Sequence, residues 1–210
     1  MTGPDPTDPI VPAADGSDDA ADPSGPAGAA PVGATLFDTA IGRCGVAWRG
    51  DTVVAVQLPE RSDDVTRHRL EAVLGSSADR DPTPPTVVAA AIRAMVDLLA
   101  GQPVDLGFVP VDLGDRSPFD RAVYDVTRSI PPGSSLTYGQ VAERVGEPGG
   151  AQAVGRSLGA NPCPIVVPCH RVLGAGGALT GFSAPGGVDT KRRMLLIEGC
   201  PAVAPTLFDQ

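Results

Sequence analysis

One stretch organises the whole chain: Asn161-Pro162-Cys163-Pro164-Ile165-Val166-Val167-Pro168-Cys169-His170-Arg171-Val172. It places a cysteine between a proline and one of only two histidines in the protein. The β-branched run from Ile165 to Val167 predicts a short buried strand. Pro168 is expected to end that strand and to restrict the backbone before it, so that Cys169 is presented at a fixed angle.

Cys169 is a candidate nucleophile. A free cysteine is only a few per cent thiolate at neutral pH, and an adjacent imidazole such as that of His170 raises this fraction. The alternative is that Cys169 is one more small buried hydrophobe, as most cysteines are. Its place between a predicted strand and a glycine-rich loop, next to His170, favours the reactive interpretation.

The other three cysteines, Cys44, Cys163 and Cys200, are expected to be merely packed or exposed. None of them forms a CxxC pair, and His68 and His170 lie far apart in the sequence, so no metal site and no cofactor are predicted. Disulfides are not expected in a reducing cytosol.

The first 34 residues differ from the rest, with seven prolines, six aspartates and no Lys or Arg. Such a segment cannot bury enough apolar surface to offset its chain entropy, so residues 1–34 are predicted to be a disordered acidic tail. No basic, apolar secretory signal begins the sequence and no later apolar run is long enough to span a bilayer. A cytoplasmic protein without a membrane partner is therefore expected.

The formal charge of −9 argues against a nucleic-acid partner, but the charge is unevenly placed. Residues 118–199 carry eight Lys and Arg against six Asp and Glu. This mildly basic half could approach phosphates, although the signal is weak by itself.

Residues 35–114 are expected to form a small α+β domain. Five elements are predicted there: strands at 43–48, 52–58 and 108–113, and helices at about 65–74 and 88–99. Arg49-Gly50-Asp51 indicates a hairpin between the first two strands. No catalytic constellation occurs in this region, which favours a scaffolding role.

Residues 115–200 are expected to form a second domain, followed by a tail at 201–210. Ser117-Pro118 predicts a helix start, and Thr137-Tyr138-Gly139-Gln140 matches a capping box that begins a helix running to about Val145. A glycine-rich turn leads to another helix at about 151–158, which completes a helix-turn-helix pattern. A last helix is predicted at about 189–198.

The second helix of this pattern exposes mostly small residues, whereas helices that read the major groove carry long polar side chains. Small side chains allow close backbone approach, which suits the minor groove. Tight helix packing or an alanine-rich sequence bias explains the same composition, and composition alone favours that explanation. Minor-groove docking is predicted because the reactive cysteine follows this helix directly. After Val172 a long loop rich in glycine extends to Gly187 and could bring backbone amides near a flat ligand.

Four motifs together resemble the O6-alkylguanine-DNA alkyltransferases: Asn161-Pro162, Pro168 to Val172, Thr137 to Gln140, and Lys191 to Gly199. The similarity is detailed over 117–199 and loose over 35–114. It implies an α+β chain with a small N-terminal ribonuclease-H-like domain. A winged-helix-like (helix-turn-helix) C-terminal domain would then bind DNA and carry the catalysis.

The resemblance implies direct-reversal DNA repair on double-stranded DNA by a monomer bound at the minor groove. The alkyl group of O6-alkylguanine, and possibly of O4-alkylthymine, would pass irreversibly to Cys169, so each molecule would act once. His170, oriented by Glu198 and acting through a water, would take the thiol proton. Tyr138 would donate to guanine N3, and Asn161 would hold the turn before the active site.

The resemblance also implies two sets of binding residues. Contacts with DNA are expected from Thr137, Tyr138, Gln140, Ala151, Gln152, Ala153, Gly155, Arg156 and Ser157. The base pocket is expected to involve Leu158, Val172, Phe182, Ser183 and Lys191, with backbone groups near Cys169 and Val172 reading the guanine edge. The family often has a tyrosine where this chain has Phe182.

Gln152 departs from the family, which places an arginine there to enter the stack that the guanine leaves. Glutamine brings no charge and less stacking surface, so repair of duplex DNA is expected to be slower. Arg156 lies on the same helix face and could partly substitute. Two alternatives remain: a sensor that binds alkylated bases without efficient transfer, and a Cys-His hydrolase. The intact Cys169 disfavours the first, and the adjacency of Cys169 and His170 disfavours the second.

Overall fold

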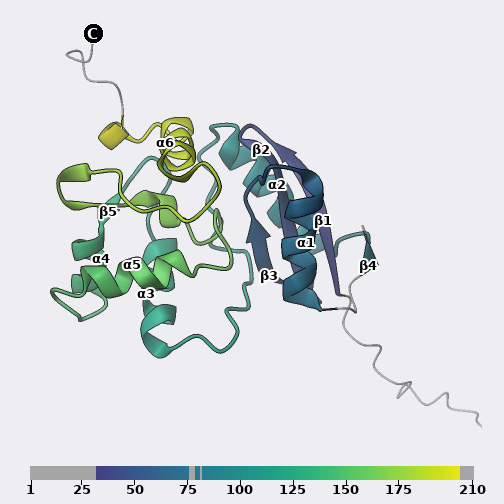
Figure 1. The fold of residues 1–210 in the computed structure, drawn as a ribbon, viewed down its shortest axis with the longest axis horizontal. Coiled ribbons are helices and arrows are strands. Elements are labelled where there is room, and N and C mark those ends of the chain that lie inside the picture. The colour runs from purple at the N-terminus through teal and green to yellow at the C-terminus, as the bar shows by residue number, and fades with distance from the viewer. Residues whose placement is uncertain (1–31, 76–78, 81, 204–210) are drawn as a thin grey trace, which may run out of the picture.

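The computed structural model describes residues 32–75, 79–80 and 82–203 (Figure 1). Most of the predicted acidic tail lies outside these residues. Its predicted end at residue 34 is wrong, however, because strand β1 already begins at Val32. The predicted C-terminal tail also begins too early: Pro201–Val203 form a 3-10 helix, and Val203 is buried in a small cluster with Leu195 and Cys200. Residues 204–210 lie outside the description.

A four-stranded sheet forms the N-terminal part, with strand order β3-β2-β1-β4. Its strands are β1 (Val32–Thr39), β2 (Gly42–Arg49), β3 (Thr52–Gln57) and β4 (Asp79–Arg80). The first three are antiparallel neighbours, whereas β4 pairs with β1 in parallel. The hairpin predicted at Arg49-Gly50-Asp51 is confirmed, and Gly50 has the positive φ of 56° that such a turn favours.

The strand predicted at 108–113 is wrong. The segment touches the free edge of β3 through a single bridge between Val53 and Val111, with Val53 N donating to Pro110 O and Asp112 N donating to Val53 O. Pro110 has no N–H, so the ladder cannot extend further toward the N-terminus. The segment nevertheless satisfies part of the β3 edge.

Two helices cover the sheet, α1 (Asp63–Leu74) and α2 (Thr86–Leu99), and both were predicted. Leu70 and Leu74 of α1 pack with Ala47 on one face, whereas α2 belongs to the larger cluster that includes Val46 and Trp48 from the other. This split follows from the alternation of side chains along β2.

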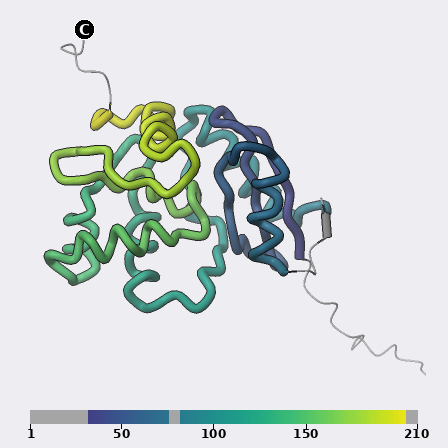
Figure 2. The backbone as a smooth tube through the Cα atoms, in the orientation of Figure 1, coloured from purple at the N-terminus to yellow at the C-terminus, as the bar shows by residue number. Residues whose placement is uncertain are grey.

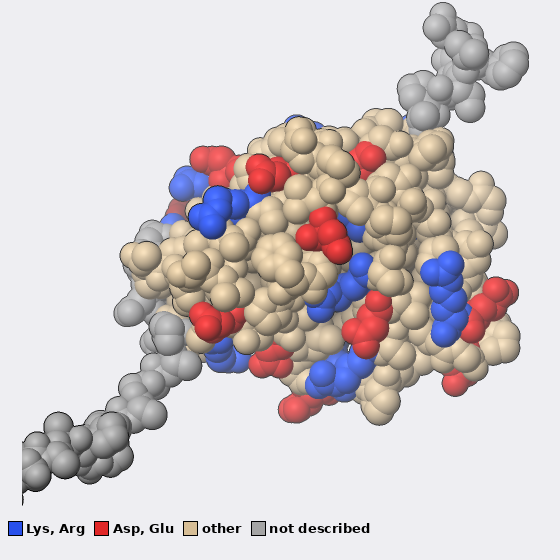
Figure 3. All heavy atoms as spheres, turned by 180° about the vertical axis from the view of Figure 1, so that it is seen from behind, with Lys and Arg blue, Asp and Glu red and all other residues tan. Residues whose placement is uncertain are grey.

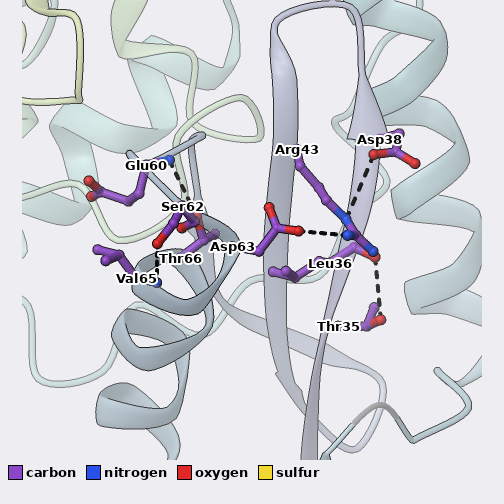
Figure 4. A network of polar contacts seen from close by, with 9 residues as sticks. All are labelled: Thr35, Leu36, Asp38, Arg43, Glu60, Ser62, Asp63, Val65 and Thr66. Atoms are coloured by element: carbon purple, nitrogen blue, oxygen red, sulfur yellow. Dashed lines mark hydrogen bonds and ion pairs between the residues drawn. The ribbon is translucent and has the colours of Figure 1, made fainter.

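The start of α1 is fixed by polar contacts shown in Figure 4. The Ser62 hydroxyl caps the helix by accepting a hydrogen bond from Val65 N, and Arg43 of β2 pairs with Asp63 at 2.7 Å. Both Arg43 and Asp63 are exposed, so the pair orients the helix more than it stabilises the fold.

Helices dominate the C-terminal part (Figure 2). They are α3 (Pro118–Arg128), α4 (Tyr138–Arg144), α5 (Ala151–Gly159) and α6 (Gly187–Ile197). Both predicted starts are confirmed: Ser117 caps α3, and Thr137 and Gln140 form a complete capping box at α4. The two-residue strands β5 (Leu136–Thr137) and β6 (Val172–Leu173) pair in parallel, which places the start of α4 beside the chain just after Cys169.

The strand predicted at Ile165–Val167 is wrong, because these residues form a buried turn. Val167 N donates to Cys163 O at 2.8 Å, and Ile165 adopts a φ of 75°. The prolines of this stretch cannot donate to a strand ladder, which removes the alternative that the β-branched run suggested. A β-branched residue at positive φ costs of order 1–3 kcal/mol, so the surrounding packing holds Ile165 in place.

One hydrophobic cluster runs through both parts of the molecule, from Trp48 and Met95 to Val154 and Val172. Backbone contacts reinforce this junction: Val56 N of β3 donates to Pro162 O at 2.9 Å, and Arg193 of α6 donates to Ala40 O. The sheet is therefore attached directly to the segment that leads into Cys169. None of the helices in the described ranges has the length and hydrophobicity that a bilayer crossing requires.

Candidate active site

Cys169 is the first residue of a 3-10 helix, Cys169–Arg171, that follows the buried turn. Asn161 holds this turn closed: its Nδ2 donates to Val167 O at 2.8 Å, and its Oδ1 accepts from Cys163 N at 3.0 Å. Cys169 N in turn donates to Val167 O. The half-buried thiol is thereby fixed by the chain on its N-terminal side.

Behind Cys169 lies a buried polar network built on Glu198, at the end of α6. Glu198 Oε1 lies 2.9 Å from His170 Nε2, and Arg171 donates to both carboxylate oxygens at 2.9 Å. Arg171 also donates to Ile130 O at 2.5 Å. Burial by itself raises the pKa of Glu198, but the hydrogen bonds from His170 and Arg171 outweigh it and lower this pKa to about 2.

Burial shifts the pKa values of His170 and Cys169 in the directions that favour their neutral forms. Burial lowers the pKa of His170, with Glu198 opposing it, and burial raises the pKa of Cys169. The Asn161 side chain and the charge of Lys191 oppose that rise. His170 Nδ1 is buried and has no hydrogen-bond partner within the described residues, so the imidazole has one nitrogen free to exchange a proton.

Lys191 of α6 is fully buried beside this centre. Its Nζ donates to Val172 O at 2.6 Å and to Thr180 O at 3.2 Å, and lies 5.5 Å from the centre of the Tyr138 ring. Burial lowers the pKa of Lys191 to about 8, while Cys169 opposes this shift. Lys191 therefore brings a positive charge close to the sulfur at neutral pH.

In front of Cys169 a pocket of about 730 Å³ opens between α4, α5 and the loop at 175–183. Several predicted site residues line it: Thr137, Tyr138, Ala151, Gln152, Gly155, Leu158, Cys169, Phe182 and Ser183. Every lining residue is uncharged. The Tyr138 hydroxyl donates to Gly181 O at 3.3 Å and to Thr180 O at 3.4 Å, long contacts that a stronger acceptor on a ligand can replace. The site can thus hold a flat, uncharged group against a thiol.

Three predicted contacts need correction. Ser157 was expected to touch DNA, but it is 4% exposed on the packed face of α5, where its carbonyl accepts from Tyr124. Val172 and Lys191 were expected in the base pocket, but both are fully buried behind its wall, and the Val172 carbonyl is bound by Lys191. A pattern on one helix cannot show which face a neighbouring helix covers.

The remaining predicted DNA contacts belong to α4 and α5, the helices beside the pocket. Gln152 and Arg156 are exposed on α5, and Ala153 is half-buried there outside the pocket lining. Gln140 is exposed, but its side chain accepts from Thr137 N in the capping box. Their contacts with DNA stay predictions.

Arg171 was not assigned a role from the sequence. Its bonds to Glu198 make it part of the polar network. Its position next to His170 was the available signal, but only its burial shows that its charge is used inside the protein.

Only some of the eight Lys and Arg side chains in residues 118–199 are free to contact phosphates. Arg171 and Lys191 are buried, and Arg121, Arg128 and Arg193 donate to backbone carbonyls. Arg144, Arg156 and Arg192 are exposed, without a partner among the described side chains. On the face in Figure 3, acidic and basic side chains are interspersed. In the described part of the chain, no three His, Cys, Asp or Glu side chains are grouped to hold a metal ion.

Residues 118–200 match the family described as 6-O-methylguanine DNA methyltransferase, DNA binding domain. A methylated-DNA–protein-cysteine methyltransferase of Mycolicibacterium paratuberculosis is 42% identical over 126 residues, which are 60% of this chain and 74% of the relative. The Mycobacterium tuberculosis protein of that name is 34% identical over 174 residues, 82% of this chain and 96% of the relative. The crystal structure of M. tuberculosis OGT in complex with DNA matches with a TM-score of 0.66 at 31% identity, over 80% of this chain and 93% of that one.

Proposed function

Since the chain belongs to the methylated-DNA–protein-cysteine methyltransferase family, we propose that it repairs DNA by transferring an alkyl group from O6-alkylguanine to Cys169. The observation that carries this proposal is a thiol on the wall of an uncharged pocket, with a buried His170–Glu198 pair behind it. The thioether that forms is stable, so each molecule reacts once and no cofactor takes part. O4-alkylthymine is a further candidate substrate.

In the proposed reaction the Cys169 thiol proton passes to His170 Nδ1 through an intervening water. The sulfur then attacks the alkyl carbon, the bond from that carbon to O6 breaks, and its electron pair stays on the purine. Tyr138 donates a proton at guanine N3, which makes the purine a better leaving group. Glu198 keeps its charge and supports the imidazolium that forms, and Lys191 favours the thiolate by its proximity.

The target base must leave the duplex to reach this pocket, because its O6 is inaccessible within the stack. We propose that α5 enters the minor groove, with Gln152 at the mouth of the pocket and Arg156 near the phosphates. Gln152 offers amide hydrogen bonds to the unpaired cytosine but no charge. The small residues Ala151 and Gly155, which line the pocket, allow the helix backbone to approach closely.

The same proposal covers the domain arrangement. We assign residues 35–114, extended to include Val32–Ala34, to a ribonuclease-H-like domain, and 115–200, extended to Val203, to a winged-helix-like domain. The helices α4 and α5 with the β5–β6 pair support the second assignment. We expect a cytoplasmic monomer that acts on double-stranded DNA.

Intact-mass spectrometry after incubation with a duplex that contains O6-methylguanine tests the function. One permanent methyl group on Cys169, absent in Cys169→Ser, is the expected result. Tight binding without an adduct would identify a sensor, and turnover of an ester or amide would identify a hydrolase. Either outcome would overturn the proposed function. Lesion removal by Cys169→Ser at the parental rate would do the same.

A further inference from the structure

Arg171 is held inside the protein by two distant parts of the chain. Its Nε donates to Glu198 Oε2 at 2.9 Å, and its Nη2 donates to Glu198 Oε1 at 2.9 Å. Its Nη1 donates to Ile130 O, in the segment between α3 and β5. Each nitrogen of the guanidinium therefore has an acceptor, although only 6% of the side chain is exposed. The proposed reaction gives this buried charge no direct part.

The Glu198 carboxylate has no contact with solvent and depends on Arg171 for its counter-charge. The Glu198 side chain is 0% exposed and that of His170 is 1% exposed. Lys191, the other buried cation, donates to the carbonyls of Val172 and Thr180 and gives no hydrogen bond to this carboxylate. A buried carboxylate without a paired cation is costly, so the guanidinium is what allows Glu198 to stay ionised.

The charge of Glu198 decides which nitrogen of His170 carries the proton. An ionised carboxylate can only accept hydrogen bonds, so His170 Nε2, 2.9 Å away, must donate to Oε1. A neutral imidazole carries one proton, and Nδ1 is therefore left with its lone pair. Nδ1 is buried and has no hydrogen-bond partner in the described part of the chain. This tautomer is the one that can take the thiol proton of Cys169.

Loss of the guanidinium would put a proton on Nδ1. Without Arg171, the pair of Glu198 and His170 would bury one uncompensated negative charge, and such a pair takes up a proton to become neutral. If Glu198 takes it, the acid donates to Nε2 and the imidazole proton moves to Nδ1. If His170 takes it, both ring nitrogens carry protons. In either case Nδ1 can no longer receive the thiol proton.

We propose that Arg171 is a positioning residue, which fixes His170 in the tautomer with its proton on Nε2 and so keeps Nδ1 free to receive the thiol proton. Arg171 acts through the charge of Glu198 and does not line the pocket in front of Cys169. This inference rests on the proposed function, because it concerns the proton that Cys169 gives up. It predicts that the charge of Arg171 matters more than the exact shape of its side chain.

Nitrogen-15 NMR of the histidine rings measures this tautomer in the full chain. The protein has only two histidines, and His68→Gln removes the exposed one, so the remaining ring signals belong to His170. Arg171→Met removes the charge, Arg171→Gln removes the charge but keeps a hydrogen-bond donor, and Arg171→Lys keeps the charge. Arg128→Met is the matched control, because Arg128 is a half-buried arginine that donates to two backbone carbonyls instead. Adduct formation with an O6-methylguanine duplex is timed by intact mass in the same variants.

At pH 7 we expect a proton on Nε2 and none on Nδ1 in the unaltered protein, in Arg171→Lys and in Arg128→Met. In Arg171→Met and Arg171→Gln we expect a protonated Nδ1. Transfer in these two variants should slow about a hundredfold, the lower end of what a general base contributes. Arg171→Lys should recover most of that loss, and Arg128→Met should keep the rate of the unaltered protein.

An Nδ1 without a proton in either folded neutral variant overturns the inference, even if transfer is slow, because Arg171 would then act only through packing. A proton on Nδ1 in the unaltered protein overturns it as well, and that measurement needs no variant to fold. The tautomer is measured without DNA, so it is independent of the transfer assay. An unaltered protein that forms no adduct refutes the proposed function instead.

Discussion

The two sides of Cys169 differ in how their polar groups are satisfied. Behind the sulfur, Glu198 is shared by His170 and Arg171, and Lys191 is held by two backbone carbonyls. In front of it, the pocket is uncharged and the polar side chains of α5, Gln152 and Arg156, are exposed to solvent. The groups of the proposed chemistry are therefore held within the folded chain, whereas the proposed contacts with DNA would depend on a few exposed side chains. We call the buried network behind the sulfur the inner side, and the pocket with the exposed side chains of α5 the outer side. Changes on the inner side should have large effects and changes on the outer side small ones.

Glu198→Gln should break the inner side most severely. It leaves the buried Arg171 without its counter-charge, and removing one partner of a buried ion pair costs about 3–5 kcal/mol. Urea unfolding should show this loss in the free energy of unfolding. Methyl transfer, timed separately by intact mass, should also be slow because His170 loses its orienting group. Glu143→Gln, an exposed change on α4, is the control and should cost less than about 0.5 kcal/mol. A loss below about 1 kcal/mol in Glu198→Gln would contradict this picture of the network.

The buried Glu198 carboxylate should also make the free energy of unfolding depend on pH. The pKa of Glu198 is lowered from 4.5 to about 2 by folding, so its stabilisation is fully present above pH 4.5 and is lost as pH falls through 2. The buried carboxylate should contribute roughly 3 kcal/mol to the difference between the unaltered protein and Glu198→Gln above pH 5. That difference should shrink steadily on acidification. A difference that is constant from pH 6 to pH 2.5 would assign the stabilisation to something other than charge.

The sequence predicts those parts of the site whose residues lie within a few positions of one another. Cys169 and His170 are adjacent, and the Thr137–Gln140 capping box is complete within four residues, so both signals are visible in the sequence. The structure confirms the capping box. The run Ile165–Val167 was read by composition as a strand, but the prolines around it and the bonds of Asn161 fold it into a turn.

Non-local packing accounts for the other differences. Nothing near Lys191 in the sequence indicates that it is buried against Tyr138 and Val172, and nothing in α5 shows that Tyr124 covers Ser157. The backbone contact between Pro110 and the edge of β3 likewise joins residues that are far apart in the sequence.

Lys191→Met tests whether the inner side tunes the thiol. Lys191 opposes the burial that raises the Cys169 pKa, so removing its charge should raise that pKa further. A higher pKa lowers the thiolate fraction at pH 7, which should slow alkyl transfer and shift its pH profile upward. Arg192→Met, the exposed neighbour on α6, is the matched control. Slower transfer with an unshifted pH profile would show that Lys191 acts only through packing.

Gln152→Arg addresses the outer side and should increase function. A guanidinium stacked in the space that the base leaves adds about 1 kcal/mol at an exposed site, or about a fivefold faster reaction with duplex DNA. The same lesion in a single-stranded oligonucleotide is the control, since no closed stack must be opened there and the rate should not change. Equal rates for Gln152→Arg and the unaltered protein on the duplex would discard the idea that Gln152 limits base flipping.

Arg156→Ala should have the smallest effect, because Arg156 is exposed and its single charge would meet at most one phosphate. If it meets one phosphate, its loss should weaken binding two- to threefold for every sequence and reduce the slope of log affinity against log salt by about one. Arg192→Ala on α6 controls for net charge. A reduced slope in Arg156→Ala alone would place the phosphate contact on α5, beside Gln152, and so separate it from the flipping step. Equal slopes in both variants would mean that α5 approaches DNA through its small residues and backbone, with no charge contributed by that helix.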